Sequence, residues 1–280
     1  MTGNAHQLSQ GRPSREPLYS EGTRDEYPIP TEYLEVEYVD FISSHVKNCD
    51  NMLISQSLYD KKFTGIFGPH KRYNKKASSW GEKSSYENLI EYIKKQWKEE
   101  KNIFSLVADE ETGSFYVYLV EGYGNGQTIV RQLSNVKEKW DDGQRITSCT
   151  SKGSTYYMVM TDNVNGYHGK GQNYFSRSSW PDVANEIGKH YKDGKIITSI
   201  CYNQGLEEYL VVMTTSSAGQ SHKWTTTSTD RSKWMDEMYK NKDYHPTIVF
   251  KDPNDDQILV VMTSDNQRSD YTIRYNYQLK

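Results

Sequence analysis

The residues of this chain best suited to chemistry are its cysteines, histidines and carboxylates, and their spacing forms no catalytic motif. The three cysteines lie far apart, at Cys49, Cys149 and Cys201. An odd number without a Cys-x-x-Cys pair argues against a disulfide framework and against a structural zinc site. The seven histidines include no i, i+4 pair and no His-Glu-x-x-His motif. We therefore expect neither a metal nor a cofactor.

The acidic and glycine-rich segments also contain no recognised binding or catalytic motif. Carboxylates gather at residues 109–111, 141–142, 207–208 and 252–256, but none shows the alternation of a calcium loop, so we expect solvated turns. The glycine-rich stretches 122–127 and 166–172 lack the spacing of phosphate-binding loops. No Gly-x-Ser-x-Gly elbow is present, and no cysteine has a local catalytic partner. The sequence predicts a protein without enzymatic activity.

Composition excludes several classes of partner. The 280 residues carry a net charge of −3, with a mean hydropathy of −0.88 and a pI of about 6.2. Basic residues are spread along the chain, which argues against nucleic-acid binding. No apolar run approaches the roughly 18 residues of a membrane span, and the first residues lack an apolar signal region. We expect a cytoplasmic protein that binds no membrane.

Two segments are candidates for protein contacts. Residues 1–33 are polar and contain four prolines, so they predict an extended arm that cannot bury a core of its own. A local basic cluster occupies residues 70–76, where a solvated strand and loop is the simpler interpretation. The candidate partner-binding residues are Arg12, Arg15, Tyr19, Arg24, Tyr27, Lys71, Arg72, Lys75 and Lys76.

The rest of the chain repeats one unit about five times. Each unit reads as a short amphipathic helix followed by three strands, and the second strands begin at residues 63, 115, 156, 209 and 258. A period near 50 residues is typical of a propeller, toroid or solenoid. The predicted units are 34–79, 80–134, 135–179, 180–229 and 230–280.

Each strand of the unit has its own pattern. First strands alternate apolar residues with Thr or Ser, second strands are nearly continuous apolar runs, and third strands are short and polar. These patterns predict half-buried strands, strands buried on both faces, and edge strands respectively. The third strands are expected around 72–78, 128–133, 173–178, 221–227 and 271–277.

Short turns between first and second strands favour antiparallel sheets. We therefore predict a mainly β fold with short helices, in which about five αβββ repeats form a closed ring similar to a small β-propeller. Closure removes open sheet edges. The sequence does not decide whether the helices cap the rim of this ring or cover its outside.

The helix ends show the repeat most clearly. An aromatic residue closes each helix, and in two units an Asp-Gly pair, ending in Gly143 or Gly194, follows where a left-handed terminating residue is needed. Recurrence in every unit favours a structural wedge between neighbouring sheets over a ligand-stacking role. The structural repeat positions are Trp97, Trp140, Gly143, Tyr191, Gly194 and Tyr239.

The same pattern resembles a known family. The order Trp140-Asp-Asp-Gly143, Ile146-Thr-Ser148, then Tyr157-Met-Val-Met-Thr161 is similar to repeats in the region C-terminal to the catalytic domain of plant casein-kinase-I-like kinases. Tyr191-Lys-Asp-Gly194 with Ile197-Thr-Ser199 is a second match. The chain has no Val-Ala-Ile-Lys, His-Arg-Asp or Asp-Phe-Gly motif. The resemblance, which covers residues 34–280 as repeats, implies a non-catalytic accessory or docking domain.

Three functional hypotheses follow. The first is a scaffold or protein-interaction module of a large intracellular assembly, with a cytoskeletal, ciliary or axonemal lattice as one example. The second is a ligand-binding or catalytic domain with a site on the ring axis. The third is a regulatory subunit that docks a kinase. Polar side chains of several repeats converging at the axis would favour the second hypothesis, whereas aromatic outer faces would favour the first.

Overall fold

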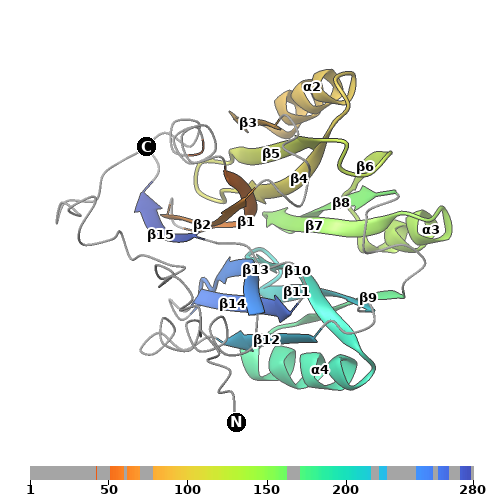
Figure 1. Cartoon of the computed structure of the whole chain (residues 1–280), viewed down its shortest axis with the longest axis vertical. Coiled ribbons are helices and arrows are strands. Elements are labelled where there is room, and N and C mark those ends of the chain that lie inside the picture. Colours follow the sequence, from red (N-terminus) through yellow and green to blue (C-terminus); the bar gives the residue numbers. More distant parts are fainter. Residues whose placement is uncertain are drawn as a thin grey trace, which may run out of the picture.

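A mainly β fold is present, and its strands form small antiparallel sheets (Figure 1). The computed structural model describes residues 42, 51–59, 62–69, 78–162, 171–215, 221–225, 244–254, 258–264 and 272–278. Within these ranges, fifteen strands form five three-stranded sheets. The predicted mainly β class and antiparallel pairing are therefore confirmed.

The strands fall into the three expected classes. The first strands are β1 (Asn51–Tyr59), β4 (Lys101–Ala108), β7 (Arg145–Lys152), β10 (Lys195–Asn203) and β13 (Tyr244–Lys251). The second strands are β2 (Lys62–Pro69), β5 (Phe115–Glu121), β8 (Thr155–Thr161), β11 (Glu208–Thr215) and β14 (Ile258–Ser264). The third strands are β3 (Ser78–Lys83), β6 (Gln127–Val130), β9 (Gln172–Arg177), β12 (Ser221–Thr225) and β15 (Thr272–Gln278).

One strand lies away from its predicted position. The first of the third strands was expected around residues 72–78, but β3 begins only at Ser78. Its sequence, Ser-Ser-Trp-Gly-Glu-Lys, has few apolar residues, so the apolar pattern gives little signal there. Pairing with the apolar strand β5 selects this segment.

Each sheet combines two consecutive units of the repeat. A second strand lies at the centre, the first strand of the same unit lies on one side, and the third strand of the preceding unit lies on the other. Thus β3 pairs with β5, and β6 pairs with β8. The last third strand, β15, pairs with β2 near the start of the described chain. The helix and three strands of one predicted unit therefore belong to two neighbouring sheets.

The helices pack on the sheets at the periphery of the molecule (Figure 1). They are α2 (Tyr86–Trp97), α3 (Val136–Asp141, preceded by the short 3-10 helix η2, Leu133–Asn135) and α4 (Trp180–Lys192). Ser85 and Ser179 cap α2 and α4 by accepting from backbone N–H groups of the first turn. Each of these two helices contacts all three strands of one sheet. This settles their position: they cover their own sheets.

Second strands are buried on both faces, as their continuous apolar sequence predicts. In β8, Tyr157 and Val159 join the core that β8 forms with the sheet of β5. Met158 and Met160, which point the other way, join the core formed with the sheet of β11. The sheets of β5, β8, β11 and β14 therefore pack face to face in succession, and β8 and β11 each contribute to two cores.

The Ile-Thr-Ser motif of the first strands marks a break in strand register. In β7 the pairing with β8 shifts between Ile146 and Ser148. The Thr between them lies within hydrogen-bond distance of the second-strand Thr, with 2.8 Å between Thr147 Oγ1 and Thr161 Oγ1. The same pair recurs in the next two sheets, at 2.9 and 3.0 Å. The Thr of the Met-Thr sequence that ends the second strand thus forms a hydrogen bond to the first strand of the same sheet.

At the ends of α2 and α3, a glutamine joins the helix to two sheets. Gln172 Oε1 accepts hydrogen bonds from the Trp140 indole N–H (3.0 Å) and from the Ile146 backbone N–H (2.8 Å). Its Nε2 donates to the Ile146 carbonyl (3.0 Å) and to Thr214 Oγ1 (2.9 Å). Gln127 makes the same four contacts one sheet earlier. The buried amide satisfies backbone groups that the register break leaves unpaired.

We expect Gln172→Ala to destabilise the fold strongly. Gln172 is 6% exposed, and its removal takes one hydrogen-bond partner from each of two donors and two acceptors; a buried group left unpaired costs about 1–3 kcal/mol where water cannot reach. Allowing for relaxation, a loss of about 3 kcal/mol in the free energy of unfolding is expected in urea denaturation. Gln204→Ala, at an exposed turn position, is the control and should change the free energy by less than about 0.5 kcal/mol.

Candidate functional site

The five first strands lie next to one another across the sheets. β1 contacts β4 and β13, β4 contacts β7, β7 contacts β10, and β10 contacts β13. Each is an edge strand of its sheet, so the backbone groups on its outer side need partners other than a ladder strand. The contacts between first strands supply those partners.

Serine hydroxyls form the repeated link. Ser148 Oγ accepts the Leu106 backbone N–H at 3.2 Å, and Ser199 Oγ accepts the Cys149 backbone N–H at 3.0 Å. Ser55 Oγ of β1 accepts the backbone N–H of Val249 in β13 at 3.1 Å. The serine of Ile-Thr-Ser therefore joins its first strand to the neighbouring one. At the junction of β10 with β13, Ile248 occupies this register position.

The first strands end around one cavity. Its volume is about 440 Å³, and every first strand or the turn after it contributes to its wall, with Gln56, Asp109, Cys149, Cys201 and Lys251 as examples. A cavity of this size fits a small ligand. We call it the first-strand cavity. The sequence analysis did not predict that these residues form one site. The polar side chains at the ends of successive first strands were the signal that could have indicated it.

Charged residues concentrate in the turn after β4. Asp109, Glu110 and Glu111 line the cavity, together with Lys251 from β13. Asp109 is only 3% exposed. Its carboxylate accepts from the Glu111 backbone N–H at 3.1 Å and from Thr112 Oγ1 at 2.8 Å. The prediction that this acidic segment is a solvated turn is wrong for Asp109. Its carboxylate is buried because it accepts hydrogen bonds from Glu111 and Thr112 of the same turn.

Asp252 is a second acidic residue that the sequence placed in solvent incorrectly. It is 5% exposed, and both of its carboxylate oxygens accept from the Tyr209 hydroxyl at 2.8 Å. The backbone N–H of Asn254 also donates to it, at 2.9 Å. Burial, with further contributions from Asp252, raises the pKa of Tyr209. Tyr209 therefore remains a neutral donor that ties the neighbouring sheet to this turn.

Two thiols lie at the wall of the cavity. Cys149 and Cys201 are 5% and 6% exposed and belong to the core between the sheets of β8 and β11. Their predicted burial in matching first strands is confirmed. Burial, and then the neighbouring Cys149 thiol, raise the pKa of Cys201. Ser199 Oγ also donates to Cys149 Sγ at 3.2 Å.

The sequence-predicted repeat positions are dispersed around the fold. Trp97 and Trp140 are partly buried and donate to Gln127 and Gln172, which suits a structural role. Gly143 and Gly194 have φ values of +88° and +72°, the left-handed conformation expected of them. Tyr191 is 39% exposed. Tyr239 lies outside the described residues, as do all nine candidate partner-binding residues.

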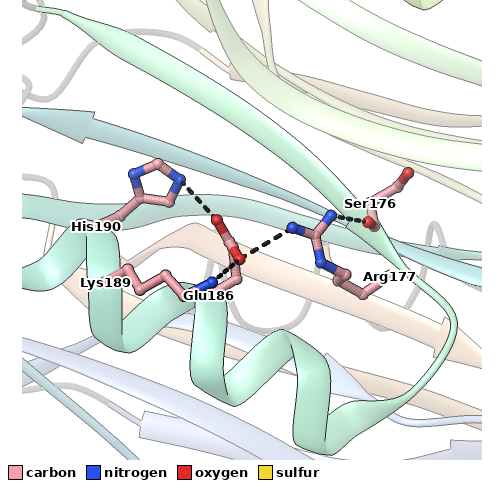
Figure 2. Close-up of polar contacts among 5 residues, drawn as sticks. All are labelled: Ser176, Arg177, Glu186, Lys189 and His190. Atoms are coloured by element: carbon pink, nitrogen blue, oxygen red, sulfur yellow. Dashed lines mark hydrogen bonds and ion pairs between the residues drawn. The ribbon is translucent and has the colours of Figure 1, made fainter.

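A separate charged cluster links α4 to β9 (Figure 2). One oxygen of the Glu186 carboxylate contacts Arg177 Nη2 of β9 and Lys189 Nζ, both at 2.9 Å. Its other oxygen lies 3.7 Å from His190 Nε2. Lys189, and then Arg177, lower the pKa of Glu186. The cluster fastens α4 to the edge strand β9 of its sheet.

Comparisons with known proteins assign no family. No family model matches the chain, and no curated protein is significantly similar to it. The resemblance to plant casein-kinase-I-like kinases therefore stays a sequence-based prediction. In the part of the chain that the structure describes, no helix is long and apolar enough to cross a membrane. Those residues also hold no group of three or more metal-ligating side chains.

We expect Glu186→Gln to lower stability slightly and only above acidic pH. The folded-state pKa of Glu186 lies below its ordinary value of 4.5. Its ion pairs therefore stabilise the fold above that value, and the contribution is lost as the pH falls through the lower folded-state pKa. Because Arg177 and Lys189 are 40% and 70% exposed, a loss of about 0.5–1 kcal/mol is expected at pH 7.

Thermal unfolding of wild type and variant at pH 7 and pH 3 measures this difference. Glu91→Gln is the matched control, because Glu91 also forms an ion pair across one helical turn, with Lys95. The Glu91 and Lys95 side chains are both about 70% exposed. A loss at pH 7 no larger than that of the control, or one that persists unchanged at pH 3, would contradict the assigned role.

Proposed function

We propose that this protein binds a small, positively charged ligand, such as a primary amine, in the first-strand cavity. The observation that carries the proposal is that all five first strands end at one cavity of about 440 Å³. Convergence of polar side chains from several repeats was the feature expected of the ligand-binding hypothesis. It favours that hypothesis over the scaffold hypothesis.

The charge of the wall supports a cationic ligand. Asp109, Glu110 and Glu111 contribute three carboxylates, whereas Lys251 contributes one ammonium group. Asp109 and Glu110 accept hydrogen bonds from neutral groups: a hydroxyl and backbone N–H groups, including that of Gly153 at 2.9 Å. Neutral donors orient a carboxylate but do not cancel its charge. A concave site with excess negative charge attracts cations.

The wall also supports recognition by shape. Val107, Ile200 and Phe250 line the same cavity as the polar groups. A mixed lining of this kind buries the hydrocarbon part of a ligand and fixes its polar end. An amine on a short apolar chain matches both features.

We further propose that the five sheets close into a ring with this cavity on its axis. The pairing of β15 with β2, and the hydrogen bond between Val249 and Ser55, support closure because both join the last unit to the first. The face-to-face cores between successive sheets also fit a propeller-like arrangement. In such a ring the first strands would surround the axis.

The scaffold and kinase-docking functions stay proposals with support from the sequence alone. The arm of residues 1–33, on which the scaffold hypothesis depends, lies outside the described residues. Within the described part of the chain, the exposed large hydrophobic side chains are Tyr191 and Leu206. They belong to different elements, so they favour no aromatic docking face.

Ligand binding can be tested with matched variants of one turn. We expect diamines and other primary amines to raise the thermal midpoint of the full chain, and a matched panel of dicarboxylates to leave it unchanged. Gln204→Trp places a large side chain at the cavity wall and should weaken amine binding at least about tenfold in calorimetry. Binding should also weaken at high salt.

Leu206→Trp is the control, because Leu206 is 49% exposed in the same turn. It should keep the affinity of the wild type within about twofold. Absence of binding by every amine, or equal binding by both tryptophan variants, would contradict the proposal. Both variants must keep the wild-type circular dichroism spectrum for the comparison to count.

Ring closure predicts a long-range effect of the last strand. A chain ending at residue 271 loses β15 and exposes the edge of β2. In a closed ring, each sheet is stabilised by packing against two neighbours, so weakening one sheet weakens the whole ring. This change should therefore reduce hydrogen-exchange protection even in the distant strand β8. In an open array of sheets the loss should stay near β2. Protection of the β8 amides at the wild-type level would therefore contradict closure.

A further inference from the structure

We propose that Cys149 and Cys201 form a two-coordinate binding site for a soft monovalent metal ion of the Cu(I) class. The two thiols come from neighbouring first strands, β7 and β10, and line the first-strand cavity together. The site uses different residues from the acidic turn, so it does not depend on amine binding.

Geometry brings the two sulfurs together without a disulfide. Both cysteines are free thiols in the structure, they pack in one buried cluster between the sheets of β8 and β11, and they line the same cavity. The backbone N–H of Cys149 donates to Ser199 Oγ, whose hydroxyl lies 3.2 Å from Cys149 Sγ. The link between first strands therefore also orients one of the two sulfurs. A pair of sulfurs fixed by strands, with access from a cavity, needs little rearrangement to hold an ion between them.

The ligand set selects the class of metal. Soft thiolate ligands favour Cu(I) over the harder divalent ions. Structural zinc sites require four ligands, and the described residues offer no group of three or more His, Cys, Asp and Glu side chains. Two sulfur ligands are enough to complete the coordination of a d¹⁰ monovalent ion, because such an ion accepts linear two-coordinate geometry. The carboxylates of the turn after β4 line the same cavity and would attract a cation to it.

Binding is balanced by proton release. Two thiols and one monovalent ion form a complex with two S–metal bonds and a net charge of −1, and both S–H protons leave to solvent. The Ser199 hydroxyl faces one sulfur, and the Lys251 ammonium group belongs to the same cavity wall. These groups offset part of the cost of placing one negative charge in a mostly buried site. Because both thiol protons are released on binding, metal affinity should rise with pH.

The experiment uses the full chain carrying Cys49→Ser, so that only two thiols remain. Anaerobic titration with Cu(I) against a chromophoric competitor, and separately with Ag(I), measures stoichiometry and affinity. We expect one ion per chain, a sulfur-to-copper absorption band in the near ultraviolet, and a loss of at least about 100-fold in affinity for Cys149→Ser and for Cys201→Ser. Ser199→Ala should bind more weakly than the parent but keep the one-ion stoichiometry.

A second measurement needs no further variant. In the same parent chain, one equivalent of Ag(I) should protect both thiols from alkylation in mass spectrometry. The proposal is overturned if either single serine variant keeps the parent affinity, if no ion binds, or if one equivalent of Ag(I) leaves both thiols open to alkylation. Amine binding is measured on metal-free protein, so the failure of one proposal leaves the other standing.

Discussion

Unpaired backbone groups at the edges of three-stranded sheets are the constraint on which this structure depends. Each first strand has a ladder partner on one side only, yet its other side faces protein. Buried N–H groups without partners are costly. Ser148, Ser199 and Ser55 meet this requirement by accepting backbone N–H groups of the neighbouring first strand. The serine of Ile-Thr-Ser in β7 and β10, and Ser55 in β1, thus join neighbouring sheets.

The exchange of third strands between units strengthens the same connections. Because β6 belongs to the sheet of β8 but follows β5 in the chain, no sheet can form from a single unit. Gln127 and Gln172 stand at the start of such exchanged strands and reach back to the first strand of their own unit. Neighbouring sheets are therefore tied by backbone ladders, by side-chain amides and by shared apolar cores. Together these ties bring the first strands close enough to enclose a cavity.

The cavity exists because the first strand has the same position and direction in every unit. Each enters from a helix or loop and leaves through a turn, so all five carboxyl-terminal ends reach one side. Differences among the units then create its chemistry. An acidic turn follows β4, a lysine ends β13, and cysteines occupy β7 and β10. The repeat supplies the frame, and departures from the repeat supply the functional groups.

The sequence by itself determined the period, the identity of nearly all strands, their antiparallel pairing and the burial of the second strands, because these follow from local apolar patterns and turn lengths. It also determined the left-handed glycines at helix ends. Tertiary structure alone decided which strands share a sheet, since β3 and β15 pair with strands of the following and the first unit. It also decided the burial of Asp109 and Asp252, whose hydrogen-bond partners come from the folded turns and the neighbouring sheet. The cavity, formed by residues about 50 positions apart, has no local pattern, so only the packing of the sheets could reveal it.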